Sequence, residues 1–366
     1  MDDERYILWL TRINGVGLKR QRQLMEYFGS AKGVFLAPRS LLKSLAILNP
    51  HNVHEIVKHQ EESIVKHYEQ ELKDKNIVFR SMYHPGYPPL LREIDNSPLG
   101  LYISGQAEVL NNGAHAVSII GARRCTAYGL EASYKLSHDL AAQGLLVISG
   151  MARGIDSMSH KGALEGGGLT VAVLGCGVDI CYPSENRRLY EQIKKNGCIL
   201  SEHPPGTTPM PGFFPMRNRI ISGLSMALVV VEAGEKSGTL ITVDQALQQG
   251  RDVLCVPGNI TSKLSIGTNR LIKEGLPPVT CYEDVLFALG LDKDDESLIQ
   301  SKKFLTLPPL TPDEKKVFDC IVEGATEINT ILHQTDSSIQ HVSAALTMLE
   351  LKGYIKLLPG QQLQRI

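Results

Sequence analysis

Residues 116–129 run AVSIIGARRCTAYG, a short apolar segment followed by a glycine that opens a turn. The same pattern returns along the chain, with a helical stretch after each turn. The apolar runs are AVSII (116–120), LLVIS (145–149), TVAVL (170–174), CILS (198–201), ALVVVE (227–232) and DVLCV (252–256). Continuous apolar strands separated by helices are typical of a parallel sheet that is covered on both faces. The pattern therefore predicts an α/β domain with a doubly wound, Rossmann-like parallel sheet.

On the N-terminal side of this pattern, residues 1–75 have amphipathic spacing and predict a separate helical domain. Within it, residues 10–22 (LTRINGVGLKRQR) resemble a helix-hairpin-helix of the SAM-like class, with Lys19, Arg20 and Arg22 after the hairpin. Such a hairpin can direct its amides at a DNA phosphate, and it can equally serve as a turn that packs two helices. Residues 83–89 (YHPGYPP) predict an extended bridge into a central domain that spans residues 76–291.

On the C-terminal side, residues 292–309 are charged, end in two prolines and predict a linker. Residues 310–366 predict three helices and a terminal strand, the layout of a winged helix. The third of these helices should be basic if it reads DNA, yet residues 337–351 contain no Lys or Arg. We therefore expect this domain to contact protein rather than DNA, or to contact nothing.

Composition places the chain among ordinary soluble proteins, with 43% hydrophobic residues, 21% charged residues and a net charge of −1 over 366 residues. The N-terminus lacks the layout of a signal peptide, and no apolar run reaches the roughly 18 residues of a membrane helix. The seven cysteines contain no CxxC pair, which argues against a zinc site and a disulfide framework. We expect a cytoplasmic protein without a membrane partner or a bound metal.

Four turns at the carboxyl ends of the predicted strands are suited to bind an anion. In an open α/β sheet this edge carries helix N-termini with free backbone amides, and glycine lets a ligand approach the backbone closely. Arg123, Arg153 and Lys236 would add positive charge at the same edge. The candidate residues in these turns are Gly121, Arg123, Ser149, Gly150, Arg153, Gly154, Gly175, Gly177, Lys236, Ser237 and Gly238. The competing interpretation is that tight strand-to-helix turns use glycine whatever the protein does.

The motifs for common nucleotide cofactors are absent. A dinucleotide site needs GxGxxG after the first strand and an acidic residue after the second, where this chain has GARRCT and Ser149-Gly150. A P-loop needs GxxxxGK[ST], which residues 234–239 (GEKSGT) do not match. His160 and His203 stand apart from any nucleophile and are better explained as structural histidines. The sequence therefore predicts neither a cofactor nor a catalytic residue.

Residues 213–221 (FFPMRNRII) combine aromatic and basic residues at a predicted helix start. Single-stranded nucleic acid needs cations for its phosphates and aromatic faces for its bases. Phe214, Arg217, Asn218 and Arg219 are the candidates for these roles. The alternative is that the aromatics belong to the core and that the arginines pair with Glu202 or Glu232.

The chain resembles the DNA-processing protein A family, known as DprA or Smf, over nearly its whole length. The resemblance rests on the order and spacing of GARRCTAYG, SGMARGID, LGCGVDICYP, SEHPPG, FPMRNRIISGLS, VVEAGEKSGTLIT and GRDVLCVPGNI. It implies a homodimer of natural transformation that protects incoming single-stranded DNA and helps load the RecA recombinase. The implied phosphate pocket comprises Gly121, Arg123, Ser149, Gly150, Gly154, Arg217, Asn218, Lys236, Ser237 and Gly238. Ala122 stands where many relatives have Ser or Thr, so one hydroxyl contact is absent.

Two other functions stay open at this point. Phosphoribohydrolases that release cytokinins share the Rossmann-like scaffold, but their PGGxGT motif has only EAGEKSGT as its nearest match here. Glu232 lies near the predicted pocket and keeps an enzymatic function possible. A nucleotide sensor that signals through its terminal domain would bind mononucleotides without regard to chain length.

Overall fold

The computed structural model describes residues 2–291, 310–322, 324–325, 328–335, 337–352, 354–358 and 362–365. The chain divides into two compact units, Met1–Asp292 and Lys293–Ile366. The predicted linker, residues 292–309, lies outside the described residues.

The first part of the chain is helical, as predicted. Its helices are α1 (Asp2–Thr11), α2 (Leu18–Phe28), α3 (Ala31–Leu36), α4 (Arg39–Ser44), α5 (Pro50–Lys58) and α6 (Glu62–Asp74). Their apolar faces enclose a core of their own around Trp9, Leu24 and Ile56, which are completely buried. The predicted hairpin joins α1 to α2, but Arg22 donates hydrogen bonds to the backbone oxygens of Asp95 and Ser97. This arginine therefore ties the helical part to the loop of residues 93–99.

Within residues 2–291, eight strands form one sheet in the order β1-β2-β6-β5-β4-β3-β7-β8. Their bounds are β1 (Ile77–Ser81), β2 (Gly100–Gly105), β3 (Ala116–Ile120), β4 (Leu146–Ser149), β5 (Thr170–Val173), β6 (Gly197–Ser201), β7 (Ala227–Val230) and β8 (Asp252–Cys255). All pairings from β6 to β8 are parallel, which confirms the predicted parallel sheet. Strand order reverses at β3, whose neighbours are β4 on one side and β7 on the other.

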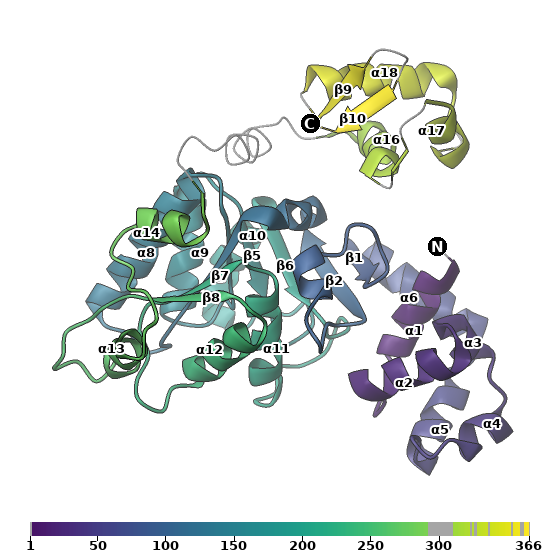
Figure 1. Ribbon diagram of the computed structural model, residues 1–366. Coiled ribbons are helices and arrows are strands. Elements are labelled where there is room, and N and C mark those ends of the chain that lie inside the picture. The colour runs from purple at the N-terminus through teal and green to yellow at the C-terminus, as the bar shows by residue number, and fades with distance from the viewer. Residues whose placement is uncertain are drawn as a thin grey trace. The chain divides into compact units, whose positions relative to one another are not determined.

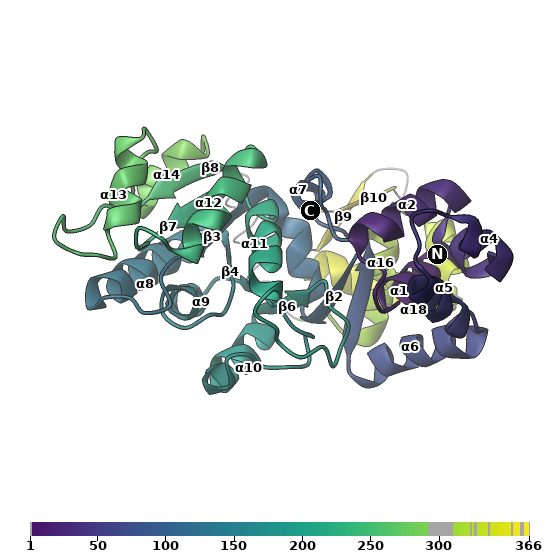
Figure 2. The same cartoon turned by 90° about the horizontal axis from the view of Figure 1, so that it is seen from below.

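Helices cover both faces of this sheet, as the continuous apolar strands require. One face carries α8 (Ala127–Ala142), α9 (Ile155–Glu165) and α10 (Arg187–Lys195), and the other carries α11 (Phe213–Gly223), α12 (Gly238–Gln248) and α13 (Ile266–Lys273) (Figures 1 and 2). A further helix, α14 (Tyr282–Ala288), packs against α8. Every residue of β3 is buried, so the two helical layers exclude water from the centre of the sheet.

Strands β1 and β2, a short helix α7 (Pro89–Arg92) and a 3-10 segment (Ala107–His115) were not predicted. Strands β1 and β2 pair antiparallel with each other, and β2 pairs antiparallel with β6, so they extend one edge of the sheet. The predicted extended bridge is instead a run of turns before α7, which begins at Pro89. The Arg80 guanidinium, which donates to the Gly86 oxygen at 2.8 Å, holds these turns against β1.

The second unit has the elements of a winged helix, which confirms the predicted class. They are α16 (Pro312–Val322), α17 (Ile328–Thr335), α18 (Ile339–Leu351), β9 (Ile355–Leu358) and β10 (Gln362–Arg365). Phe318, Ile331 and Leu349 lie in a core that belongs to this unit alone. On α18, Ile339 and Leu351 are exposed apolar residues. The helix that would read DNA in such a fold thus presents no cation between residues 337 and 351.

His160 on α9 is a buried structural residue, as expected, and it predicts an acid-sensitive fold. Thr170 donates its hydroxyl to the Val147 oxygen at 2.7 Å, so its oxygen accepts from Nδ1 of His160, also at 2.7 Å. Nε2 is left buried without a hydrogen-bond partner among the described residues. Burial, with a smaller contribution from Arg217, lowers the pKa of His160 to about 3.

A histidine with a depressed pKa binds a proton in the unfolded state before it binds one in the folded state. Stability should therefore fall as pH drops from about 6.5, the ordinary histidine pKa, towards 3. We expect His160→Asn, which keeps a donor for Thr170, to lose less stability than the wild type between pH 7 and pH 4, as measured by urea unfolding. Parallel pH profiles for both proteins would contradict this assignment.

Candidate nucleic-acid interface

A cavity of about 760 Å³ opens at the carboxyl ends of β3 and β7, where the strand order reverses. Its walls come from the loop after β3, from the first turns of α11 and from the loop that enters α12. Ligands of open α/β sheets bind at this topological switch point. The sequence-predicted residues that line it are Gly121, Arg123, Phe214, Arg217, Asn218, Lys236, Ser237 and Gly238.

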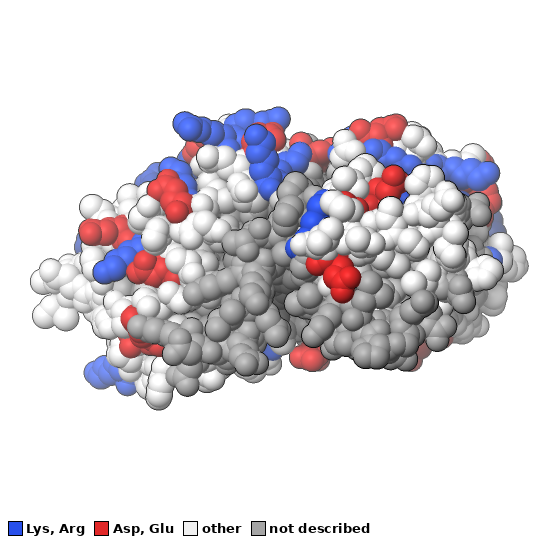
Figure 3. Space-filling model, turned by 90° about the horizontal axis from the view of Figure 1, so that it is seen from above, with Lys and Arg blue, Asp and Glu red and all other residues white. Residues whose placement is uncertain are grey.

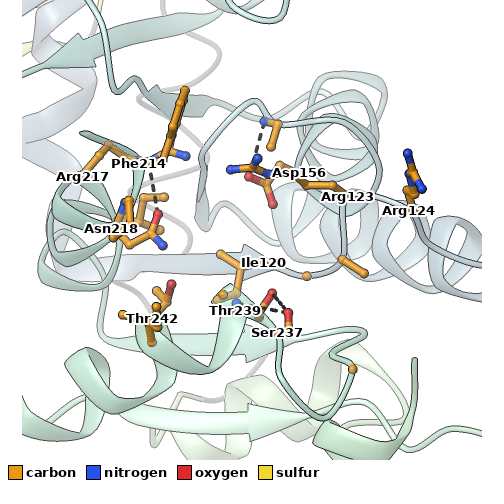
Figure 4. A pocket seen from close by; sticks show the side chains of 18 of the residues that line it. Ile120, Arg123, Arg124, Asp156, Phe214, Arg217, Asn218, Ser237, Thr239 and Thr242 are labelled. Carbon is orange, nitrogen blue, oxygen red and sulfur yellow. Dashed lines mark hydrogen bonds between the residues drawn. The ribbon is translucent and has the colours of Figure 1, made fainter. Parts of the chain in front are cut away.

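Arg123, on the loop after β3, and Lys236, on the loop that enters α12, supply exposed positive charge to this cavity. The guanidinium of Arg123 lies 5.4 Å from the centre of the Phe214 ring. Figure 4 shows Arg123 reaching into the cavity and the neighbouring Arg124 pointing away from its centre. Because Arg123 and Lys236 are exposed, both can form charge-assisted hydrogen bonds with a phosphate.

Phe214 lies at the cavity wall and is only half-buried, so it is not an ordinary core residue. Its ring centre is 5.4 Å from that of Tyr182, with the planes 32° apart. Phe213 is also half-buried, and its ring centre lies 4.2 Å from that of His203. Two aromatic faces beside a cation are suited to the stacking of a nucleobase.

The N-terminus of α12 forms the third element of the cavity. Ser237 caps the helix: its hydroxyl oxygen accepts from the backbone amide of Thr239 at 3.2 Å. The two hydroxyl groups also lie 3.0 Å apart, at the lower side of the view in Figure 4. A helix N-terminus carries partial positive charge, which favours an anion at this position.

Arg217 is buried beneath the cavity floor, with only 4% of its surface exposed. Its Nη1 donates to the backbone oxygen of Gly150 at 2.7 Å and to that of Val173. Burial lowers the pKa of Arg217 to about 10, against the opposing effect of Asp156. A Cβ atom at Gly150 would lie 2.6 Å from the guanidinium, so any side chain there would displace Arg217 from its present position. Arg217 thus joins the ends of β4 and β5 and adds charge from below.

Asp156, on the first turn of α9, was not predicted as a site residue, although it ends the SGMARGID motif. Its buried carboxylate accepts from the Ala152 amide at 3.4 Å, which holds the loop after β4 in place. Burial raises the pKa of Asp156, whereas Arg217 and Arg123 act to lower it. Further lining residues that were not predicted include Arg124, Tyr182, Pro211, Thr239 and Thr242.

A second hollow of about 220 Å³ adjoins the cavity and shares Arg123, Phe214 and Arg217 with it. Gly150, Arg153 and Gly175 line this second hollow. Arg153 pairs with Glu185, whose Oε2 lies 3.1 Å from Nη2 of the arginine. The carboxylate raises the pKa of Arg153 and offsets its charge. This arginine is therefore less available to a phosphate than Arg123.

The structure does not bring the remaining candidates to either wall. Ser149 is buried and donates to the Ile119 oxygen at 2.6 Å. Gly154 adopts a φ of 77°, and a Cβ there would lie 2.5 Å from the Ala122 oxygen. Gly177 packs against Pro204, and Arg219 pairs with Glu202 at 2.5 Å, as the alternative interpretation of this arginine proposed. These residues shape the loops around the cavity.

Comparison with known proteins shows the family to which the chain belongs. A family model described as DNA recombination-mediator protein A matches residues 78–290, and one described as DprA winged helix domain matches residues 303–361. Protein Smf of Synechocystis is 33% identical over 393 residues, which cover 99% of each chain. The chain belongs to the DprA/Smf family. DNA processing protein DprA of Streptococcus pneumoniae is 42% identical over 200 residues, which cover 55% of this chain and 70% of that protein.

Solved structures of the DprA/Smf family agree with the fold. The X-ray structure of DprA from Streptococcus pneumoniae aligns with a TM-score of 0.66 and 32% identity, covering 77% of this chain and 97% of that one. A structure of DprA from Helicobacter pylori, whose subject is its single-stranded DNA binding mode, aligns with a TM-score of 0.53 and 28% identity. It covers 58% of this chain and 95% of the Helicobacter pylori chain.

Proposed function

We propose that this chain binds single-stranded DNA at the cavity between β3 and β7. The observation that carries the proposal is the convergence of two exposed cations, a helix N-terminus and the aromatic pair Tyr182 and Phe214 around one cavity. The structure of the Helicobacter pylori relative is described as one of its single-stranded DNA binding mode, and we propose the same ligand here. Binding would depend on this local site because cations and carboxylates are mixed over the face in Figure 3 and the net charge is −1.

Fluorescence anisotropy with a labelled oligo-dT tests this proposal directly. The expected result is a strong preference for the single strand over the matching duplex, with affinity that falls steeply as salt rises. Phosphate contacts carry no base information, so sequence dependence should be weak. A mononucleotide that competes as well as the oligonucleotide would overturn the proposal and favour a nucleotide sensor.

We further propose that the chain acts in the cytoplasm during natural transformation, as a homodimer that protects incoming DNA and helps load RecA. Membership of the DprA/Smf family supports this role. Two joined cavities would add avidity on a long strand. In the described residues no helix is long and apolar enough to cross a membrane.

We propose binding without catalysis, and the position of Glu232 supports this choice over the phosphoribohydrolase alternative. Glu232 is buried and its carboxylate accepts from the amide of Thr126 at 2.9 Å and from its hydroxyl at 2.6 Å. It lines a separate hollow with Tyr128 and Pro257. A carboxylate held in this way is a helix-capping group rather than a general acid. Release of free base from nucleoside monophosphates by the purified protein would favour the enzyme instead.

For the winged helix we expect weak or absent binding to duplex DNA. The exposed side of α18 offers no Lys or Arg to the phosphates, and Lys352, just after it, is paired with Glu314 at 2.5 Å. An isolated 305–366 fragment should therefore leave a labelled duplex unbound at micromolar concentrations and moderate salt. Tight binding of the duplex by this fragment would contradict the prediction.

A further inference from the structure

Helix α10 begins directly beside the second hollow. Pro183, Ser184 and Glu185 line that hollow, and the 3-10 turn Ser184–Asn186 leads into α10 at Arg187. In a strand–helix–strand unit the helix starts at the carboxyl edge of the sheet and runs back over its face. Figure 2 shows α10 on the face opposite α11 and α12. A strand of DNA that leaves the cavity on this side therefore meets α10 first.

One side of α10 packs on the sheet and the other presents cations. Leu189, Tyr190 and Ile193 are buried. Arg188, Gln192 and Lys195 are exposed, and their i, i+4, i+7 spacing places them in one row along the helix. The row is about 10 Å long, from the helical rise of 1.5 Å per residue. It contains no carboxylate.

The acidic residues near this row are already engaged. Glu191 pairs with Arg187 at 3.2 Å, on the neighbouring row of the helix. Glu185 is held by Arg153 at the mouth of the second hollow. Among the described residues, no carboxylate lies within ion-pair distance of Arg188 or Lys195. The two side chains are therefore exposed to solvent and available to contact a ligand.

We propose that the row Arg188–Gln192–Lys195 extends the DNA-binding surface, so that the sugar–phosphate backbone of a single strand continues from the cavity along α10. This inference rests on the proposed binding of single-stranded DNA. The two cations contact phosphates and Gln192 adds a neutral donor, so the row increases affinity without reading sequence. A strand too short to leave the cavity does not reach it.

The test compares Arg188→Gln/Lys195→Gln with the wild type on two oligo-dT lengths, about six and about twenty nucleotides, within the range of single-strand site sizes. The matched control is Lys66→Gln/Lys73→Gln on α6, which removes two exposed cations at the same i, i+7 spacing. The expected result is an affinity loss of about tenfold for the long oligonucleotide only. The salt slope for that oligonucleotide should fall by about 1.4, the value for two lost contacts to a single strand.

Each outcome bears on one of the two proposals. Unchanged binding of the long oligonucleotide, or equal losses on both lengths, would overturn the role of α10 and leave the cavity standing. An equal loss in the α6 control would also overturn it, because net charge alone would then explain the effect. Failure of the wild type to bind either oligonucleotide would instead refute the proposed function itself.

Discussion

Arg123→Ala/Lys236→Ala should lower the affinity for single-stranded DNA about a hundredfold at low salt. Both side chains are exposed and line the same cavity, so a single strand that occupies it can meet both. A hydrogen bond to a charged group contributes roughly 1.5–3 kcal/mol, and about 1.4 kcal/mol corresponds to a tenfold change. Each replacement alone should therefore cost about tenfold. Anisotropy titrations of the single and double variants measure these losses.

Because both cations are exposed, the loss of DNA binding can be measured without a change in the stability of the fold. Because neither side chain is buried, the free energy of unfolding should stay within about 0.5 kcal/mol of the wild type. The control is Lys135→Ala/Lys273→Ala, which removes two exposed cations on α8 and α13, outside the residues that line the cavity. If the double variant bound DNA as the wild type does, the cavity would be the wrong site.

The central sheet was predictable because its strands are buried on both faces. Every residue of β3 is buried, so the sequence 116–120 is apolar without alternation and marks the strand clearly. Strand β1 has an exposed position at Val78, and β2 follows a loop rich in turns, so neither has a continuous apolar run at a regular distance from the next. Their place at the sheet edge depends on pairing between distant segments, which local patterns do not encode.

The position of the candidate cavity was also predictable, but the exposure and pairing of its residues were not. Glycine turns and cations at the strand ends indicated the edge of the sheet at which the cavity lies, because parallel strands end together there. A cation beside a glycine turn has the same appearance in sequence whether it faces solvent or a carboxylate. Arg123 is exposed, whereas Arg219 is paired with Glu202. Only the fold distinguishes the two.

Arg217→Ala should destabilise the fold by about 3 kcal/mol. The guanidinium is buried and joins β4 to β5 through the backbone oxygens of Gly150 and Val173. Alanine would leave both oxygens buried without a donor and open a cavity beneath the site. Relief of the unfavourable burial, which lowers the pKa of Arg217 to about 10, offsets only part of this loss. Urea unfolding near pH 7 measures the change.

The same variant also separates a structural arginine from a ligand-binding one. Lys236→Ala, at an exposed position of the same cavity, should weaken DNA binding without moving the urea midpoint. Arg217→Ala should move the midpoint and also weaken binding at temperatures where it is folded, because the Gly150 loop loses its support and the cavity floor loses positive charge. Arg217→Lys restores the charge but cannot reproduce the planar fork, so it should recover binding more fully than stability. An unfolding midpoint for Arg217→Ala equal to that of the wild type would show that the buried contacts contribute nothing to the fold.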